Sequence, residues 1–123
     1  MAGKIIADQI EHSTAGSLDT SYVVNGSAKA WIHFLGDAAT VGVLDGLNHA
    51  SISDLGSGRY SVSFTNSFNN ATYASNVTGS TQRIGTNDTD SHATSGITYE
   101  IVNESGTFTD CKQGQAVVHG DLA

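Results

Sequence analysis

Residues 50–77, ASISDLGSGRYSVSFTNSFNNATYASNV, form the most strongly patterned stretch of the sequence and decide its fold class. Three large residues there occupy every second position: Tyr60, Val62 and Phe64. A period of two places them on one face of a β-strand and the intervening hydroxyl side chains on the other. The two glycines before this run allow the positive φ angles of a tight reversal. Ser51–Asp54 and Arg59–Thr65 are therefore predicted to form a β-hairpin.

Several more short segments favour strands. In Ser27–Leu35, Trp31 and His33 alternate with Ile32 and Phe34, which predicts a strand that is buried on both sides. The same kind of pattern predicts five other strands: Ser21–Val24, Thr40–Leu44, Ile97–Val102, Thr107–Cys111 and Ala116–His119. In Thr107–Cys111, Phe108 is expected to face the core.

The polar region Thr78–Gly96 is predicted to be an exposed loop, because Ile84 is its only large aliphatic residue. No segment has the pattern of a helix of about ten or more residues. About eight to ten short strands predict an all-β protein, a single-domain antiparallel β-sandwich or barrel-like fold.

The length of 123 residues fits one domain and is too short for two. Residues 1–20 are predicted to form an extended N-terminal arm and loop, followed by a single β domain over 21–123. Within the arm, Ile5, Ile6 and Ile10 need a partner surface. The chain is 38% hydrophobic with 14 glycines, and so lean a core is typical of a protomer of an obligate oligomer.

The formal net charge of −7 argues against two classes of partner. Nucleic-acid binding needs lysine and arginine to neutralise phosphate, and attraction to anionic lipid needs the same residues. No apolar run approaches the roughly 18 residues of a membrane span, and the N-terminus lacks the apolar region of a signal peptide. We therefore expect a soluble product made in a cytosol, without nucleic-acid or membrane partners.

The sequence offers only weak candidates for a metal site. The five histidines lack the local spacing of zinc ligands: His12, His33, His49, His92 and His119. Asn87, Asp88 and Asp90 carry oxygen ligands of the kind that Ca²⁺ takes, but the pattern is not that of an EF-hand. A solvated loop is the better interpretation, so no metal and no cofactor are predicted.

Catalytic residues are not recognisable either. Cys111, the single cysteine, lies in a strand pattern and is predicted to be a small buried hydrophobe. Asp54 and Glu100 could meet in space as the paired acids of a glycosidase, but the sequence cannot show whether they do. The sequence therefore predicts a protein that is not an enzyme.

Aromatic side chains are candidates for contact with a glycan or a protein, since they combine apolar area with a polar tip. They are Tyr22, Trp31, Tyr60, Tyr73 and Tyr99. We expect Trp31, Tyr60 and Tyr73 to belong to the core. The residues predicted to supply the core and the contacts between chains are Trp31, Ile32, Phe34, Tyr60, Val62, Phe64, Phe68 and Tyr73.

Three phrases carry a resemblance to a known group of proteins: KIIADQIEHSTAG at residues 4–16, SAKAWIHF at 27–34 and SISDLGSGRYSVSFTNSFNNATYA at 51–74. They resemble a module of small β-rich virion proteins of tailed bacteriophages, some of which are tail-fibre-type parts and others stand-alone virion proteins. Residues after Gly79 match only loosely. The resemblance implies a β-rich, trimeric component on the exterior of a phage particle.

Two functions are compatible with that resemblance. A tail fibre carries a long shaft and a baseplate adaptor, for which this chain has no room, so a capsid decoration (cement) protein is the first hypothesis. It would form homotrimers and bridge subunits of the major capsid protein, with the arm reaching a neighbour. The alternative is a tail-fibre-type module that binds host polysaccharide through loops Asn66–Asn70 and Asn87–Asp90.

Overall fold

The computed structural model describes residues 3–123. Two four-stranded sheets form the body of the molecule. One sheet has the order β4 (Gly42–Leu47), β3 (Ala30–Leu35), β10 (Gln113–His119) and β7 (Ala74–Gly79). The other has the order β5 (His49–Asp54), β6 (Arg59–Phe64), β9 (Gly96–Val102) and β8 (Ile84–Asn87). Every pair of neighbouring strands is antiparallel, so the predicted all-β antiparallel class is confirmed.

The predicted hairpin is confirmed as β5 and β6. Ile52 pairs with Val62 across it, which places both on the inner face. Gly56 and Gly58 in the connecting turn have φ angles of 115° and 68°. The turn thus uses the left-handed conformations that glycine adopts without strain.

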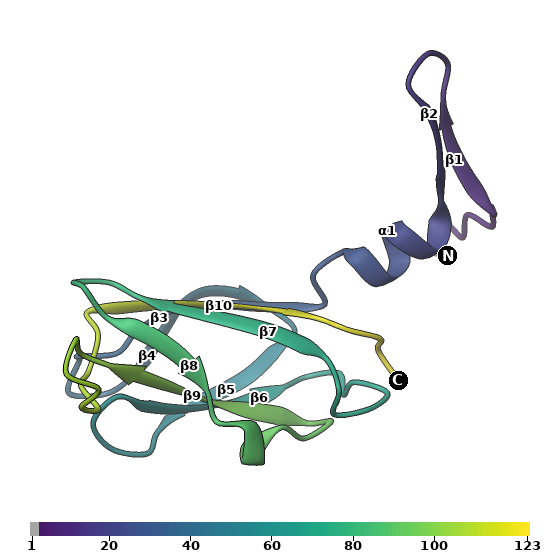
Figure 1. Cartoon of the computed structure of the whole chain (residues 1–123). Coiled ribbons are helices and arrows are strands. Elements are labelled where there is room, and N and C mark those ends of the chain that lie inside the picture. The colour runs from purple at the N-terminus through teal and green to yellow at the C-terminus, as the bar shows by residue number, and fades with distance from the viewer. Residues whose placement is uncertain (1–2) are drawn as a thin grey trace.

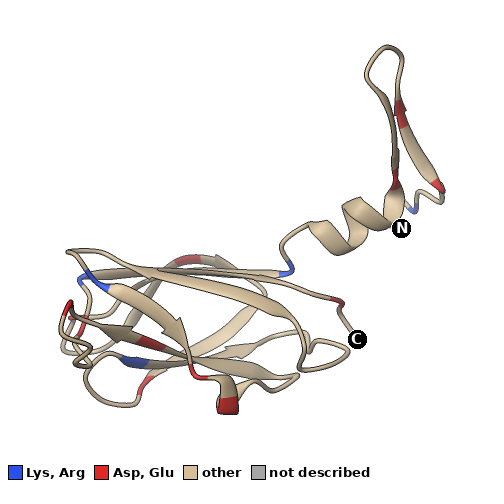
Figure 2. Ribbon diagram, in the orientation of Figure 1, with Lys and Arg blue, Asp and Glu red and all other residues tan. Residues whose placement is uncertain are grey.

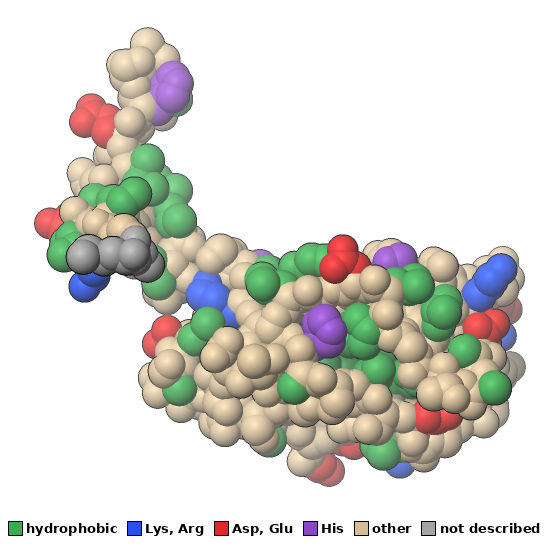
Figure 3. Space-filling view, turned by 180° about the vertical axis from the view of Figure 1, so that it is seen from behind, with side chains coloured by type: hydrophobic (Ala, Val, Ile, Leu, Met, Phe, Trp, Pro, Cys, Tyr) green, Lys and Arg blue, Asp and Glu red, His purple; other side chains and the backbone are tan. Residues whose placement is uncertain are grey.

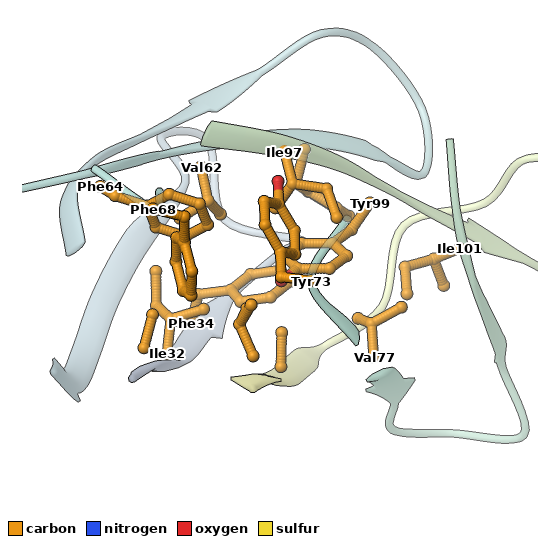
Figure 4. Close-up of a cluster of buried hydrophobic side chains, with 14 of the residues drawn as sticks. Ile32, Phe34, Val62, Phe64, Phe68, Tyr73, Val77, Ile97, Tyr99 and Ile101 are labelled. Carbon is orange, nitrogen blue, oxygen red and sulfur yellow. The ribbon is translucent and has the colours of Figure 1, made fainter. Parts of the chain in front are cut away.

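The hydrophobic core lies between the two sheets, which face each other (Figure 1). Figure 4 shows side chains from both sheets converging in this layer. Seven of the eight residues predicted for the core are buried there: Ile32, Phe34, Tyr60, Val62, Phe64, Phe68 and Tyr73. The eighth, Trp31, is half-buried, because odd-numbered residues of β3 point away from the core. Its assignment to the core was wrong, and so was the prediction that this strand is fully buried on both sides.

The N-terminal segment differs most from the prediction. Gln9–His12 (β1) and Gly16–Asp19 (β2) form an antiparallel hairpin, where a loop was expected after residue 10. Thr20–Gly26 form helix α1, so the predicted strand at Ser21–Val24 is wrong. The Asp19 carboxylate accepts a hydrogen bond from the Ser21 backbone N–H at 2.8 Å and caps the helix.

Hairpin and helix project from the body (Figure 1). We call residues 3–26 the N-terminal segment; the first two residues of the predicted arm lie outside the described residues. The first strand of the body starts at Ala30. Within residues 3–123, no helix has the length and apolar character needed to cross a membrane.

Two predictions in the second half of the chain were also wrong. The expected loop at Thr78–Gly96 contains strand β8, which pairs with β9, and the short 3-10 helix η1 (Thr89–Ser91). The expected strand Thr107–Cys111 is reduced to one bridge between Val102 and Phe108. Phe108 is 44% exposed rather than in the core, since its ring lies beside the Arg59 guanidinium, 5.9 Å from centroid to Cζ.

Candidate functional site

The N-terminal segment carries half of the exposed large hydrophobic side chains in the described residues. It carries seven large hydrophobic residues that are at least 40% exposed: Ile5, Ile6, Ile10, Leu18, Tyr22, Val23 and Val24. Hydrophobic side chains gather on this projecting segment in Figure 3. None of residues 3–26 is buried. An apolar surface of this kind on a folded protein indicates an interaction site.

Part of this surface is a groove of about 370 Å³ between the start of the chain and helix α1. The three isoleucines predicted to contact a partner line it: Ile5, Ile6 and Ile10. Val23 and Val24 of α1 line the opposite side. We call these five residues the arm cluster. The sequence analysis missed the two valines, because it assigned them to a strand of the β domain.

Hydrogen bonds, rather than burial, hold the segment together. The Thr20 hydroxyl donates to the carbonyl oxygens of Ala7 at 2.8 Å and Asp8 at 3.0 Å. The hydrogen bond to Ser21 lowers the pKa of the Asp19 carboxyl. An isolated two-stranded hairpin and a seven-residue helix are each marginal in water without packing. The segment is therefore marginal by itself.

A second candidate lies on the outer face of the β4-β3-β10-β7 sheet. It is a groove of about 500 Å³. We call it the outer-sheet groove and define it by the six side chains that alternate outward on three strands: Trp31, His33, Asn76, Thr78, Gln115 and Val117. The register forms two rows of three, one through Trp31, Val117 and Asn76 and one through His33, Gln115 and Thr78.

Of these six residues, only Trp31 and His33 were singled out from the sequence, and neither of them was predicted to line a surface groove. The other four come from strands about forty to eighty residues further along the chain, and only the pairing of β10 with both β3 and β7 unites them. The alternation along a strand indicates which of its residues face outward. The order of the strands in the sheet decides which of these residues become neighbours.

The buried residues predicted as contacts between chains leave little surface for that role. Of the candidate contact aromatics, Tyr60, Tyr73 and Tyr99 are at most 6% exposed. Burial raises the pKa of each of their phenols. Tyr22, at 69% exposed, and Trp31 are the two that reach the surface.

The histidines are dispersed. His12 accepts a backbone hydrogen bond from Ala15 in the β1-β2 turn, and His119 Nδ1 lies 3.0 Å from the Gly26 carbonyl oxygen. The His92 ring packs on Tyr73, with centroids 5.0 Å apart. Within residues 3–123, no three histidine, cysteine or acidic side chains are grouped so as to hold a metal ion.

The acidic loop after β8 makes internal contacts. The Asn87 amide donates to the Ser75 carbonyl oxygen at 2.9 Å. The Asp88 carboxylate accepts a hydrogen bond from the Asp90 backbone N–H and contacts the Arg59 guanidinium at 3.4 Å. These polar groups stabilise the turn around η1, which explains why so polar a sequence is ordered.

The two acids considered for glycoside hydrolysis do not face each other. Glu100 pairs in register with Arg59 on the outer face, and its carboxylate lies 3.3 Å from the Arg59 Nε. Asp54 pairs with Tyr60, which points into the core. The side chain of Asp54 therefore lies on the inner face of the sheet, opposite to the face that carries Glu100.

Cys111 is buried, as predicted. Burial raises the pKa of its thiol, whereas a reactive cysteine needs a lowered pKa and exposure.

The acidic side chains are not concentrated at one site. Figure 2 shows acidic residues spread over several elements of the body and the N-terminal hairpin. Comparison with known protein families, curated proteins and solved structures finds no match for this chain.

Proposed function

We propose that the chain is a non-enzymatic structural protein of a tailed-bacteriophage virion, and specifically a homotrimeric capsid decoration protein. Its body acts as a β-sandwich module on the outside of the particle. The N-terminal segment attaches it to neighbouring copies and to the major capsid protein. The phrases at residues 27–34 and 51–74, which resemble virion modules, point to this class of protein.

The observation that carries the proposal is the state of the N-terminal segment. Seven large hydrophobic residues are exposed on it, and none of residues 3–26 is buried. A monomer gains nothing from such a surface, whereas a subunit that docks on a larger assembly buries it. Apolar burial contributes about 25 cal/mol per Å², so covering the five side chains of the arm cluster supplies several kcal/mol at each contact.

Trimerisation multiplies this gain. A trimer presents three arms to the same lattice, and the second and third arms bind at the high effective concentration that the first creates. Modest affinity of one arm is then sufficient for stable decoration. The acidic body stays on the outside and limits association between particles.

The alternative, a polysaccharide-binding tail-fibre-type module, placed the sugar contacts in loops Asn66–Asn70 and Asn87–Asp90. Polar side chains of these loops are engaged internally: Asn70 accepts a hydrogen bond from Thr72 at 2.9 Å, and Asn87 binds Ser75. Because these asparagines already bind within the protein, they are less available to a sugar, which favours the decoration role.

The test is co-sedimentation with phage capsids that lack the protein, together with light scattering for the oligomeric state. We expect a trimer that decorates capsids and loses this binding when Met1–Glu11 are deleted. The double variant Ile5→Asp, Ile6→Asp is expected to behave like the deletion. Leu55→Asp is the matched control, because Leu55 is 51% exposed in the β5-β6 turn of the body. Unchanged decoration by the deletion variant would contradict the role of the segment.

A further inference from the structure

The outer-sheet groove has the size and the lining of a small-molecule site. Its volume of about 500 Å³ lies within the range of about 300–1,000 Å³ that is typical of ligand pockets. Trp31 and Val117 form one apolar row with Asn76 at its end, and the parallel row through His33, Gln115 and Thr78 is polar.

Three of the four polar side chains of the groove are free to bind, whereas His33 Nε2 lies 3.3 Å from the side-chain oxygen of Gln113. The side chains of Asn76, Thr78 and Gln115 have no hydrogen-bond partner within residues 3–123, whereas those of Asn48, Asn87 and Asn103 are engaged. Two carboxamides and a hydroxyl offer both donors and acceptors beside the indole of Trp31. A ligand that matches them needs an apolar face and a rim of hydroxyl groups.

Charge narrows the class of ligand further. Strands β3, β7 and β10 contain no lysine, arginine, aspartate or glutamate, and Asp45 is the one acidic residue of β4. Asp45 lies at the edge, as the register partner of His33, and its carboxylate accepts a hydrogen bond from the Gly46 backbone N–H. Without a lysine or an arginine on these strands, a phosphorylated or otherwise anionic ligand would find no permanent cation to pair with.

We propose that the outer-sheet groove binds a neutral saccharide. A pyranose ring stacks its C–H face on the indole of Trp31, and its hydroxyl groups bond to the side chains of Asn76, Gln115 and Thr78. The site goes beyond the decoration role and does not depend on it, because it lies on the body and shares no residue with the arm cluster. A virion protein with such a site would attach particles to surface polysaccharide.

Trp31 supplies a direct readout, since it is the one tryptophan of the chain. The full-length protein is first screened on an array of neutral gluco-, manno-, galacto- and N-acetylhexosamine oligosaccharides, with sialylated and phosphorylated glycans alongside. The retained oligosaccharide is then titrated while the emission of Trp31 is recorded. We expect retention of neutral glycans and a saturable change in the intensity of the emission.

Two exposed positions test the hydrogen bonds without disturbing the core. Asn76→Ala and Gln115→Ala are each expected to weaken binding about 3- to 10-fold, the usual worth of one neutral hydrogen bond. Asn25→Ala is the matched control for the amides, since Asn25 is exposed outside the groove, and Tyr22→Ala is the control for an exposed aromatic outside the groove. Trp31→Ala is expected to abolish retention on the array while the circular dichroism spectrum keeps its β-sheet form.

Three results would overturn the proposal. The first is an array on which no neutral glycan is retained, or only anionic ones are. The second is equal retention by Trp31→Ala or by the pair Asn76→Ala and Gln115→Ala. The third is failure of acrylamide to quench Trp31 in the assembled protein, which would mean that another copy of the chain covers the groove.

Discussion

The phenol of Tyr60 donates a hydrogen bond to the carbonyl oxygen of Gly36 at 2.9 Å, and so ties strand β6 to the end of β3 across the core. Tyr60 is fully buried, and its hydroxyl also lies 3.2 Å from the Asp110 carboxylate. One side chain therefore joins the two sheets and the C-terminal connection to β10.

Removal of this hydroxyl should destabilise the fold without creating a large cavity. Tyr60→Phe leaves the Gly36 carbonyl without its donor, and we expect a loss of about 1–2 kcal/mol in the free energy of unfolding. Urea denaturation measures it. Tyr22→Phe is the control, since Tyr22 is exposed on α1. Equal stability of Tyr60→Phe and the wild type would show that the bond contributes nothing.

The buried phenols also predict how stability depends on pH. Burial raises the pKa of Tyr60 and of Tyr99 above the ordinary tyrosine value, so both stay neutral in the folded state when the unfolded chain already ionises. Their contribution is complete below the unfolded pKa of about 10 and is lost as the pH rises above it. We expect urea midpoints to be level from pH 7 to about pH 8, to fall slightly as the thiol of Cys111 ionises in the unfolded chain, and to fall further near pH 10, less steeply in Tyr60→Phe. A midpoint that rises above pH 10 would contradict this assignment.

Gly114 is the cross-strand partner of Phe34, and a Cβ at this position would overlap the Phe34 ring. Because Phe34 is fully buried, the ring has no free space into which to move. Gly114→Ala should cost about 1–3 kcal/mol, the usual effect of overpacking. Gly42→Ala on β4 is the matched control, since nothing lies within 4 Å of its added methyl group. Similar thermal midpoints for the two variants would contradict the close packing.

The hairpin β5-β6 and the inward residues of β6 could be predicted because their alternation is regular and glycines mark the turn. Trp31 shows the limit of the same reasoning. Its large apolar side chain suggested the core. However, Ile32 and Phe34, which are 3% and 0% exposed, occupy the inner face of β3, so Trp31 lies on the outer face. The sequence showed that the side chains of this strand alternate between two faces. The size of one side chain did not show which face packs against the core.

The N-terminal segment shows a different limit. Val23 and Val24 favour a strand by local propensity, yet the Asp19 cap starts a helix whose hydrogen bonds are local. The arm isoleucines are exposed, and their need for a partner stays a prediction. The outer-sheet groove was beyond sequence reasoning, because it depends on which strands are neighbours rather than on any one strand's pattern.

The arm cluster makes a further prediction about when the N-terminal segment is ordered. Its backbone hydrogen bonds are exposed to water, so in a dilute monomer the amides of β1, β2 and α1 should exchange with solvent within seconds, while those of β6 and β9 exchange slowly. On assembly, burial of the cluster should protect the segment by at least about 100-fold, which corresponds to roughly 2.7 kcal/mol of stabilisation at each arm. Hydrogen exchange with mass spectrometry at nanomolar and micromolar concentrations measures both states. Ile5→Asp, Ile6→Asp should leave the segment unprotected at either concentration, with the body unchanged. If the segment of the dilute monomer is already as well protected as β6, its order does not depend on a partner and the attachment role loses its physical basis.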